Sequence, residues 1–559
     1  MRQFAATLED LFHAYWPYLL TAIVAVIVGG MVDPINRNDS HLWRMVLACI
    51  TLGFVLARVA IQWLKASRVW TQLLHGVMVV ACVGGVFNYY QFDRQIFEGI
   101  NDYTDITYYY LNSKYLDELG YFGLYAAVLQ ADKEQQGTHI NHIRQYRDLR
   151  NYEVVPVKEG FVHGREIRDQ NFTPERWELF KTDAVFFLDR LDRNALRSNF
   201  FVDHGYNPPP TWSIIGGTMA NWTPVEQIHW IAHVDTVIVV LMFALIGWAY
   251  GFEPMMFGIL FFCLTFSGRW PILGQSLMRF DWVAALVVGV CFLKKKQHLP
   301  AGMFMAYAAM NRIFPAIFFA PWFFAAAIEV VRERKLHKRH MHFIAGAAVT
   351  TILLAGGAAA DYGPSIFKSS AQNLVMHNES YSSHRVGLGD LLVYRGETTR
   401  AQINEGGGII VKEHAVQDMQ PFLKGAGVLA LLWVALYVFR TRREDWALIG
   451  LAVLPFYCIT NPQINYYNLR LVLILWHATR LDERPSHRIL LGLLLLTEVA
   501  TQATKVWNLD RYTTTTTTSM GLAIYLSVLV GWMALEIWKG RGDPTSSPDS
   551  GEPLPAPAG

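Results

Sequence analysis

The strongest constraint on this chain is a series of apolar runs, each about as long as a helix needs to cross a lipid bilayer. Such a helix needs about 20 mostly apolar residues. Only 17% of the 559 residues are charged, whereas soluble globular proteins carry about 25%. We therefore predict an all-α polytopic membrane protein, with spans near residues 16–32, 42–64, 69–90, 227–250, 252–267, 281–293, 340–360, 423–440, 446–460, 465–480, 488–507 and 519–538.

One further apolar stretch, 301–331, is too long for a single straight crossing and contains Pro315 and Pro321. Proline removes a helix hydrogen bond and clashes with the preceding turn, which favours two half-spans that meet near Arg312–Pro315. This arrangement puts every Lys/Arg-rich loop on one side, as expected of the cytoplasmic face. One long tilted helix is the alternative. The prediction is about 12–14 transmembrane or re-entrant helices, with both termini cytoplasmic.

The predicted spans divide the chain into six parts. No cleavable signal peptide is evident, so the first apolar run is interpreted as the first span. The parts are N-terminal transmembrane helices at 1–90, a large extracytoplasmic loop at 91–226, a transmembrane core with the broken helix pair at 227–360, a second extracytoplasmic loop at 361–422, C-terminal transmembrane helices at 423–538 and a disordered cytoplasmic tail at 539–559. Long loops tend to carry function, so we expect the chemistry on the outer face.

Charge and cysteine content argue against several classes of protein. The formal net charge is +2, which does not suggest a nucleic-acid partner. The five cysteines all fall inside apolar runs and have no close pairing. Neither a disulfide framework nor a zinc site is therefore indicated, and we expect no metal and no cofactor.

Acids and tyrosines are concentrated where the chain leaves the third span, in "NDYTDITYYYLNSKYLDELGYFGLY" (101–125). Apolar residues at helical spacing predict an interfacial amphipathic helix over 107–129. Extending this helix back by one turn places on one polar stripe Asp102, Asp105, Tyr109 and Asn112. A carboxylate at the membrane surface can act as a general base towards a hydroxyl. The alternative is that these acids cap a helix or simply face water.

Several outer turns carry cations at the same expected level. "SGRWPILGQSLMRFDW" includes Arg279, "AYAAMNRIFPAIF" places Arg312 at the tip of the broken pair, and "SYSSHRVGLGDLLVYRGETTR" includes His384 and Arg385. Arginine suits phosphate because its planar fork presents several donors. Each residue alone could instead snorkel or be an ordinary loop residue. Several cations beside a carboxylate favour a phosphate site.

These patterns resemble the C-type glycosyltransferases, polytopic enzymes that use polyprenyl-phosphate sugars. The likeness is greatest to bacterial polyprenyl-phosphate-mannose-dependent mannosyltransferases with α-1,2 activity. It is carried by the acids of "NDYTDI", by the proline turn "GYNPPPTW" and by "GQSLMRFDWVAALVVGVCFLKKKQHLPAGMFMAYAAMNRIFPAIFF". The last stretch has a Gly-Gln turn, an apolar span, a basic loop and a basic residue three positions before a proline. The loop at 380–400 is a weaker similarity.

The resemblance implies an enzyme of the bacterial inner membrane that acts on its extracytoplasmic face among membrane lipids. It would transfer a sugar, mannose in the first instance, from a polyprenyl-phosphate donor to a hydroxyl of a glycan, glycolipid or protein acceptor by inverting displacement. Asp105, or else Asp102, would be the general base. The donor phosphate would be bound by Arg279, Arg312, Arg385 and His384, and the pocket would include Tyr109, Asn112, Gln275 and Tyr206.

Two other functions stay open at this point. A transporter or flippase of a lipid-linked saccharide predicts inverted repeats and ionisable residues near the midplane. We find no duplicated pattern, and Asp235 is the main acid inside a predicted span. A non-catalytic scaffold that binds partners through 91–226 is the third possibility. Within the enzyme prediction, arabinose and glucose are alternative donor sugars, because sugar choice depends on a few hydrogen bonds.

Overall fold

The protein is a predominantly helical integral membrane protein. The computed structural model describes residues 2–191, 199–269, 272–379, 382–405, 408–441 and 443–539. Across these ranges the one sheet is a short antiparallel pair, β1 (Gln145–Arg147) and β2 (Val154–Pro156). The all-α prediction is therefore confirmed. The predicted tail at 540–559 lies outside the described residues.

Eight helical segments of the described chain are long and apolar enough to cross a membrane. They are α2 (Arg37–Trp63), α3 (Arg68–Tyr89), η1 to α13 (Val225–Tyr250), η3 to α17 (Phe314–Glu333), α18 (Lys338–Tyr362), α23 (Gln420–Thr441), α27 (Pro485–Val506) and α28 (Arg511–Trp538). Within η1 to α13 lie η1 (Val225–Gln227), α12 (Ile228–Ala232) and α13 (Val234–Tyr250). Large side chains such as Leu56, Ile352 and Leu429 are mostly exposed on these helices, as expected where a helix faces lipid.

The other predicted crossings are shorter helices. They are α1 (Arg2–Gly29) with its apolar part at Tyr15–Gly29, α14 (Phe252–Leu264), α15 (Asp281–Lys294), α24 (Asp445–Ile449), η5 (Gly450–Ala452), α25 (Val453–Ile459), η6 (Ile464–Arg470) and α26 (Leu471–Thr479). At 1.5 Å per residue, the 14 residues of α15 extend about 21 Å, less than the hydrocarbon core. Apart from α1, whose apolar part alone is short, these helices do not by themselves have the length of a full crossing.

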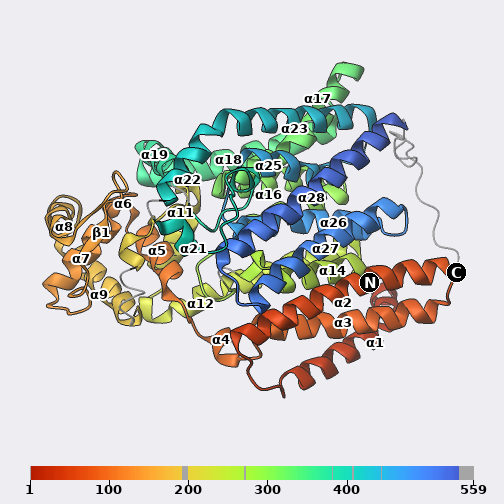
Figure 1. Ribbon diagram of the computed structural model, residues 1–559, viewed down its shortest axis with the longest axis horizontal. Helices are drawn as coiled ribbons and strands as arrows, with labels where there is room; N and C mark the ends of the chain where they lie inside the picture. The colour runs from red at the N-terminus through yellow and green to blue at the C-terminus, as the bar shows by residue number, and fades with distance from the viewer. Residues whose placement is uncertain are drawn as a thin grey trace.

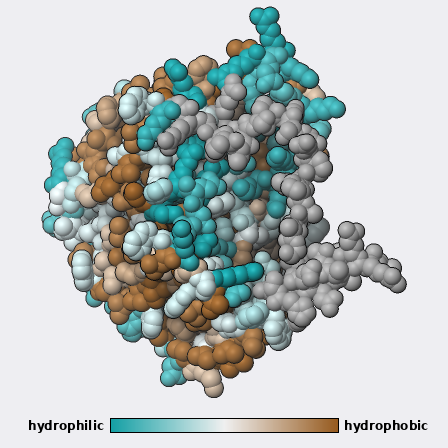
Figure 2. Space-filling model, turned by 90° about the vertical axis from the view of Figure 1, so that its right-hand side faces the viewer, coloured by the Kyte–Doolittle hydropathy of each residue, from teal (hydrophilic) through white to brown (hydrophobic). Residues whose placement is uncertain are grey.

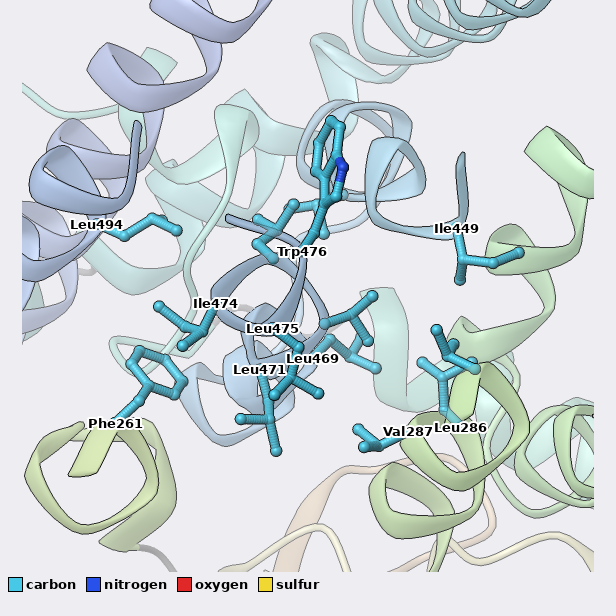
Figure 3. Close-up of a cluster of buried hydrophobic side chains, with 14 of the residues drawn as sticks. Phe261, Leu286, Val287, Ile449, Leu469, Leu471, Ile474, Leu475, Trp476 and Leu494 are labelled. Atoms are coloured by element: carbon cyan, nitrogen blue, oxygen red, sulfur yellow. The ribbon is translucent and has the colours of Figure 1, made fainter. Parts of the chain in front are cut away.

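The short helices α14, α15 and α24 to α26 form the centre of the bundle. Nearly every residue of α15 and α26 is buried, as expected of helices that are apolar on all sides and are surrounded by other helices. In Figure 3, α26 lies at the centre, with Phe261 of α14, Leu286 of α15, Ile449 of α24 and Leu494 of α27 around it. This core supports the loops that follow and precede its helices.

The stretch 301–331 is broken where the prolines predicted. Helix α16 (His298–Asn311) ends at Asn311, and Arg312 is extended with φ −150° and ψ 131°. The chain then continues through η3 (Phe314–Phe319) into α17 (Ala320–Glu333). Arg312 takes up extended backbone because the helix cannot continue so close to Pro315. The break leaves the Arg312 side chain at the end of α16.

The segment after α3 folds into a separate layer with its own core. Figure 1 shows it at one end of the bundle, as the orange and yellow helices. Its elements are α4 (Arg94–Glu98), α5 (Tyr103–Lys114), α6 (Leu116–Leu119), α7 (Leu124–Glu134), the β1–β2 pair, α8 (Val157–Asn171) and α9 (Pro174–Arg190). Helix α11 (Pro210–Trp222) follows and packs on α5. We call α4 to α9 the end domain.

The predicted amphipathic helix over 107–129 is wrong. The structure has three helices there, interrupted at Gly120, whose φ of +54° and ψ of −151° L-residues rarely adopt. Leu111, Tyr115 and Leu119 are buried inside the end domain and do not lie on a membrane surface. Tyr115 packs edge-on to Phe180 at 5.1 Å between ring centroids. The apolar spacing reflects a domain core.

The second predicted outer segment is mostly short helices. They are α19 (Ser365–Glu379), α20 (Leu388–Leu392), α21 (Arg400–Asn404) and α22 (Gly408–Asp418), with η2 (Ser267–Arg269) in an earlier turn. Helix α1 begins on the side of the bundle that lies opposite the end domain, and helix α28 finishes on that same side (Figure 1). Figure 2 looks onto that opposite face, where hydrophilic residues gather across the middle and hydrophobic ones along the margins.

Candidate functional site

Helix α5, the turn before α15 and the end of α16 bring together Asp105, Arg279, Arg312 and Tyr109. Asp105 lies in the first turn of α5, and Tyr109 follows one turn later. Arg279 precedes α15, and its Nε lies 3.1 Å from Asp105 Oδ2. Its guanidinium carbon also lies 4.5 Å from the centre of the Tyr109 ring. Arg312 donates from Nη2 to the Tyr109 hydroxyl at 3.1 Å.

The Asp105 carboxylate is already engaged by a hydroxyl. The Ser276 Oγ donates to Asp105 Oδ2, on the same oxygen that pairs with Arg279. The Asp105 side chain keeps 17% exposure. A partly exposed carboxylate that accepts from a hydroxyl lies within the hydrogen-bond reach that a general base needs.

The turn before α15, which carries Arg279, is held in place by Gln275 and Asp235. Gln275 donates from Nε2 to the carbonyls of Ile96 (2.9 Å) and Gly99 (2.8 Å) and accepts from the Asn101 N–H at 2.7 Å. Asp235 accepts the backbone N–H groups of Arg279 at 2.8 Å and Phe280 at 3.0 Å. Gln275 therefore fixes the entry to α5, and Asp235 anchors the Arg279 loop.

Asp102, the alternative base, caps a helix. It is the N-cap of α5 and accepts from the Thr104 N–H at 2.9 Å. Asn112 is fully buried and donates to the Gly120 carbonyl at 2.8 Å. Asp102 and Asn112 thus do not join Asp105 at a site, because Asp102 is used as the N-cap of α5 and Asn112 is buried against the Gly120 turn.

A cavity of about 290 Å³ lies next to the arginine–tyrosine cluster. It is bounded by the proline turn before α11, the end of α16, helix α19 and the loops around 382–385 and 462–466. Its basic lining side chains are Arg312, Arg385, His204 and His377. No carboxylate of the described residues lines it, and neither Asp105 nor Arg279 does. A cavity with guanidinium groups and no acid suits an anion.

The rigid turn "NPPP" forms one wall of this cavity through Asn207, Pro209 and Pro210. Tyr206 lies behind the wall, fully buried, with its hydroxyl 2.6 Å from Ser213 Oγ. Its ring packs against the ring of Tyr109 with centroids 6.1 Å apart. Tyr206 therefore supports Tyr109 and does not reach the cavity.

Arg385 and His384 point into different spaces. Arg385 forms an isolated bridge with Gln463 and donates to the carbonyls of Asn461 (2.8 Å) and His377 (3.1 Å). Its side chain lines the large cavity, whereas His384 lines a smaller pocket and its Nε2 lies 3.2 Å from Arg511 Nη1. Burial, followed by the charge of Arg511, lowers the pKa of His384 to about 4. His384 is therefore neutral near pH 7.

Sequence reasoning did not assign three residues near the site. His204 and His377 line the cavity with rings 5.3 Å apart, and burial lowers the pKa of His377 to about 3. Asp281 accepts from the Tyr307 hydroxyl at 3.0 Å and from Asn311 Nδ2 at 3.3 Å. His204 stands beside the proline turn in "HGYNPPP", which was the available signal. His377 has no such neighbour in the sequence.

The described residues contain no group of three or more His, Cys, Asp or Glu side chains that could hold a metal. The five cysteines are unpaired. Comparisons with protein-family models, with curated proteins and with solved structures find no match for this chain.

Proposed function

We propose that the protein is an integral-membrane glycosyltransferase of C-type architecture. It moves a sugar, mannose in the first instance, from a polyprenyl-phosphate donor to an acceptor hydroxyl on the extracytoplasmic face. The observation that carries the proposal is that Arg279 pairs with Asp105 and stacks on Tyr109, whose hydroxyl accepts from Arg312, next to a cavity lined by arginines and by no carboxylate of the described residues.

The donor phosphate would occupy the large cavity. Arg312 and Arg385 line it from opposite loops, and both hold fixed positions through bonds to backbone carbonyls, Arg312 to Asn311 at 2.8 Å. Preorganised cations stabilise the negative charge that develops on a leaving phosphate. The mostly apolar remainder of the wall, such as Phe314 and Leu374, suits the lipid end of such a donor.

Asp105 would be the base of an inverting displacement. Its carboxylate takes the proton of the acceptor hydroxyl, and the acceptor oxygen forms a bond to the anomeric carbon. The bond from that carbon to the phosphate oxygen breaks, and its electron pair leaves with the lipid phosphate. The Ser276 hydroxyl, which donates to Asp105, occupies the position that the acceptor hydroxyl would take.

The test supplies purified protein with radiolabelled polyprenyl-phosphate mannose, arabinose or glucose and a membrane extract. Asp105→Asn should lower transfer at least about 100-fold, the usual contribution of a general base. Asp102→Asn is the matched control, because asparagine caps helices as well as aspartate does; it should transfer like wild type. Transfer that survives Asp105→Asn but is lost in Asp281→Asn would move the base to Asp281.

A transporter of a lipid-linked saccharide is the second candidate. Arg470 and Glu498 form a fully buried ion pair between η6 and α27, and ionisable residues inside membrane helices often line a transport path. The same preparation in liposomes separates the two. Movement of the donor across the bilayer without transfer to any acceptor would favour the transporter.

A further inference from the structure

A second, smaller pocket lies on the other side of the Arg385–Gln463 bridge. Its volume is about 40 Å³, and its polar lining consists of Arg37, Arg269, His384, Gln463, Asn465 and Arg511. Helices α2 and α28, which contribute Arg37 and Arg511, both begin at the end of the bundle that faces the end domain (Figure 1). Gln463 also lines the large cavity, so the bridged segments form a wall between the two spaces.

The most buried cations at this pocket, Arg269 and the neighbouring Arg44, have no carboxylate partner among the described residues. Arg269 is 6% exposed, and the contact of its guanidinium is with the His41 ring. Arg44, 1% exposed, lies near it over the Tyr89 ring, and its Nε and Nη1 have no hydrogen-bond partner. Among the described residues, no carboxylate pairs with Arg37, Arg44 or Arg269.

His41 does not supply the missing negative charge. Its Nδ1 lies 2.9 Å from Gln502 Oε1, so Nδ1 carries the proton and Nε2 accepts from Arg269. A neutral imidazole accepts a hydrogen bond from one guanidinium N–H, but it does not neutralise the positive charge of Arg269. A buried cation without a counter-charge is strongly unfavourable, which indicates that an anion completes this site.

We propose that the small pocket binds one phosphoryl group of a molecule other than the one held in the large cavity. Guanidinium groups that approach from α2, η2 and α28 suit a tetrahedral group with several free oxygens better than a flat carboxylate. The volume has room for a few heavy atoms, since one water needs about 10–15 Å³.

The test is thermal unfolding of the full-length protein in detergent, in inorganic phosphate and in sodium chloride of equal ionic strength. It uses an Arg312→Gln background as well as wild type, so that the large cavity contributes little. Phosphate should raise the unfolding temperature, because a ligand of the folded state stabilises it. Arg269→Gln and Arg511→Gln should each raise, by about tenfold or more, the phosphate concentration that gives the same increase in unfolding temperature. Arg395→Gln, at an exposed arginine, is the control and should respond like its parent.

The Arg269→Gln variant also distinguishes binding from a structural role. In chloride alone it should unfold at the same temperature as wild type or higher, because it removes an unbalanced buried cation. A lower temperature in chloride with an unchanged phosphate response would assign Arg269 to packing and overturn the proposal. So would equal phosphate responses in wild type, Arg269→Gln and Arg511→Gln.

Nanodiscs separate a lipid headgroup from a soluble phosphorylated ligand. If the group comes from a lipid, phosphatidylglycerol should stabilise the protein more than phosphatidylcholine does, and Arg269→Gln should abolish the difference. If it comes from a soluble molecule, free phosphate alone should stabilise. No stabilisation by either would overturn the proposal. Sugar transfer is not measured, so failure of the proposed function leaves this result intact.

Discussion

The guanidinium carbon of Arg279 lies 4.5 Å from the centre of the Tyr109 ring. Cation–π contact with a tyrosine contributes about 0.5–2 kcal/mol, more where water is excluded. Here it directs the Arg279 side chain, 10% exposed, along the ring and against Asp105. The hydroxyl of the same ring accepts from Arg312 at 3.1 Å. One side chain therefore sets the spacing of two cations.

Tyr109→Phe should weaken donor binding without abolishing transfer. It keeps the ring under Arg279 but removes the hydroxyl that accepts from Arg312. A lost hydrogen bond to a charged group costs about 1–2 kcal/mol, which corresponds to about a 5- to 30-fold rise in the donor KM. Steady-state kinetics with labelled donor measure this. The control is Tyr108→Phe, which loses a bond to the Phe200 carbonyl in the end domain; a similar rise in KM there would contradict the assignment.

Gly346→Ala should destabilise the protein, whereas Gly356→Ala in the same helix should not. A Cβ on Gly346 would lie 2.1 Å from the Leu299 carbonyl oxygen, where α18 crosses α16, but a Cβ on Gly356 would meet nothing within 4 Å. Small residues allow such close crossings in membranes, and overpacking costs about 1–3 kcal/mol. Thermal unfolding in detergent compares the two. Equal stability of both variants would show that the crossing is looser than described.

Removal of one partner of the Arg470–Glu498 pair should be more harmful than removal of both. The two side chains are 1% and 0% exposed, and Arg470 also donates to Thr265 and Ser267 at 3.0 Å each. Arg470→Met or Glu498→Leu should each cost about 3–5 kcal/mol, since a buried charge remains unpaired. The double variant should lose clearly less free energy of unfolding than the two single variants lose in total. Denaturant unfolding of the four proteins measures the coupling, and strict additivity would argue against a direct pair.

Stability should rise with pH between about pH 4 and 6.5, in part because of His384. Burial, with Arg511 and Arg400 nearby, lowers the folded-state pKa of His384 from 6.5 to about 4. In that window the unfolded chain binds more protons, so the free energy of unfolding increases with pH. One histidine contributes at most about 1.4 kcal/mol per pH unit.

His384→Asn should reduce the slope of the free energy of unfolding against pH between about pH 4 and 6.5. It should leave that slope unchanged above pH 7. His377, whose pKa is lowered to about 3, supplies part of the slope that remains. Unfolding midpoints at half-unit pH steps give the comparison. An unchanged slope in His384→Asn would mean that its imidazole titrates normally in the folded protein.

Part of this structure could be predicted because it depends on local composition. The length of the apolar runs predicts membrane helices, since a bilayer of about 30 Å needs about 20 apolar residues. Pro315 and Pro321 predict the break that leaves Arg312 at the end of α16, since proline cannot continue a helix hydrogen-bond ladder. The spacing of the cysteines argues against disulfides, and the described structure has none.

The site itself was decided by tertiary structure. Asp105 and Ser276 are 171 positions apart, and no periodic pattern states that their loops meet. Gly120 ends α6 and separates it from α7 within a regular apolar pattern, because one residue at positive φ redirects the chain. Adjacent Arg385 and His384 line different pockets, because the chain turns at Ser383–His384 and Arg385 then bridges to Gln463. Hydropathy and helical period are properties of neighbouring residues, whereas the meeting of charges depends on how distant helices pack.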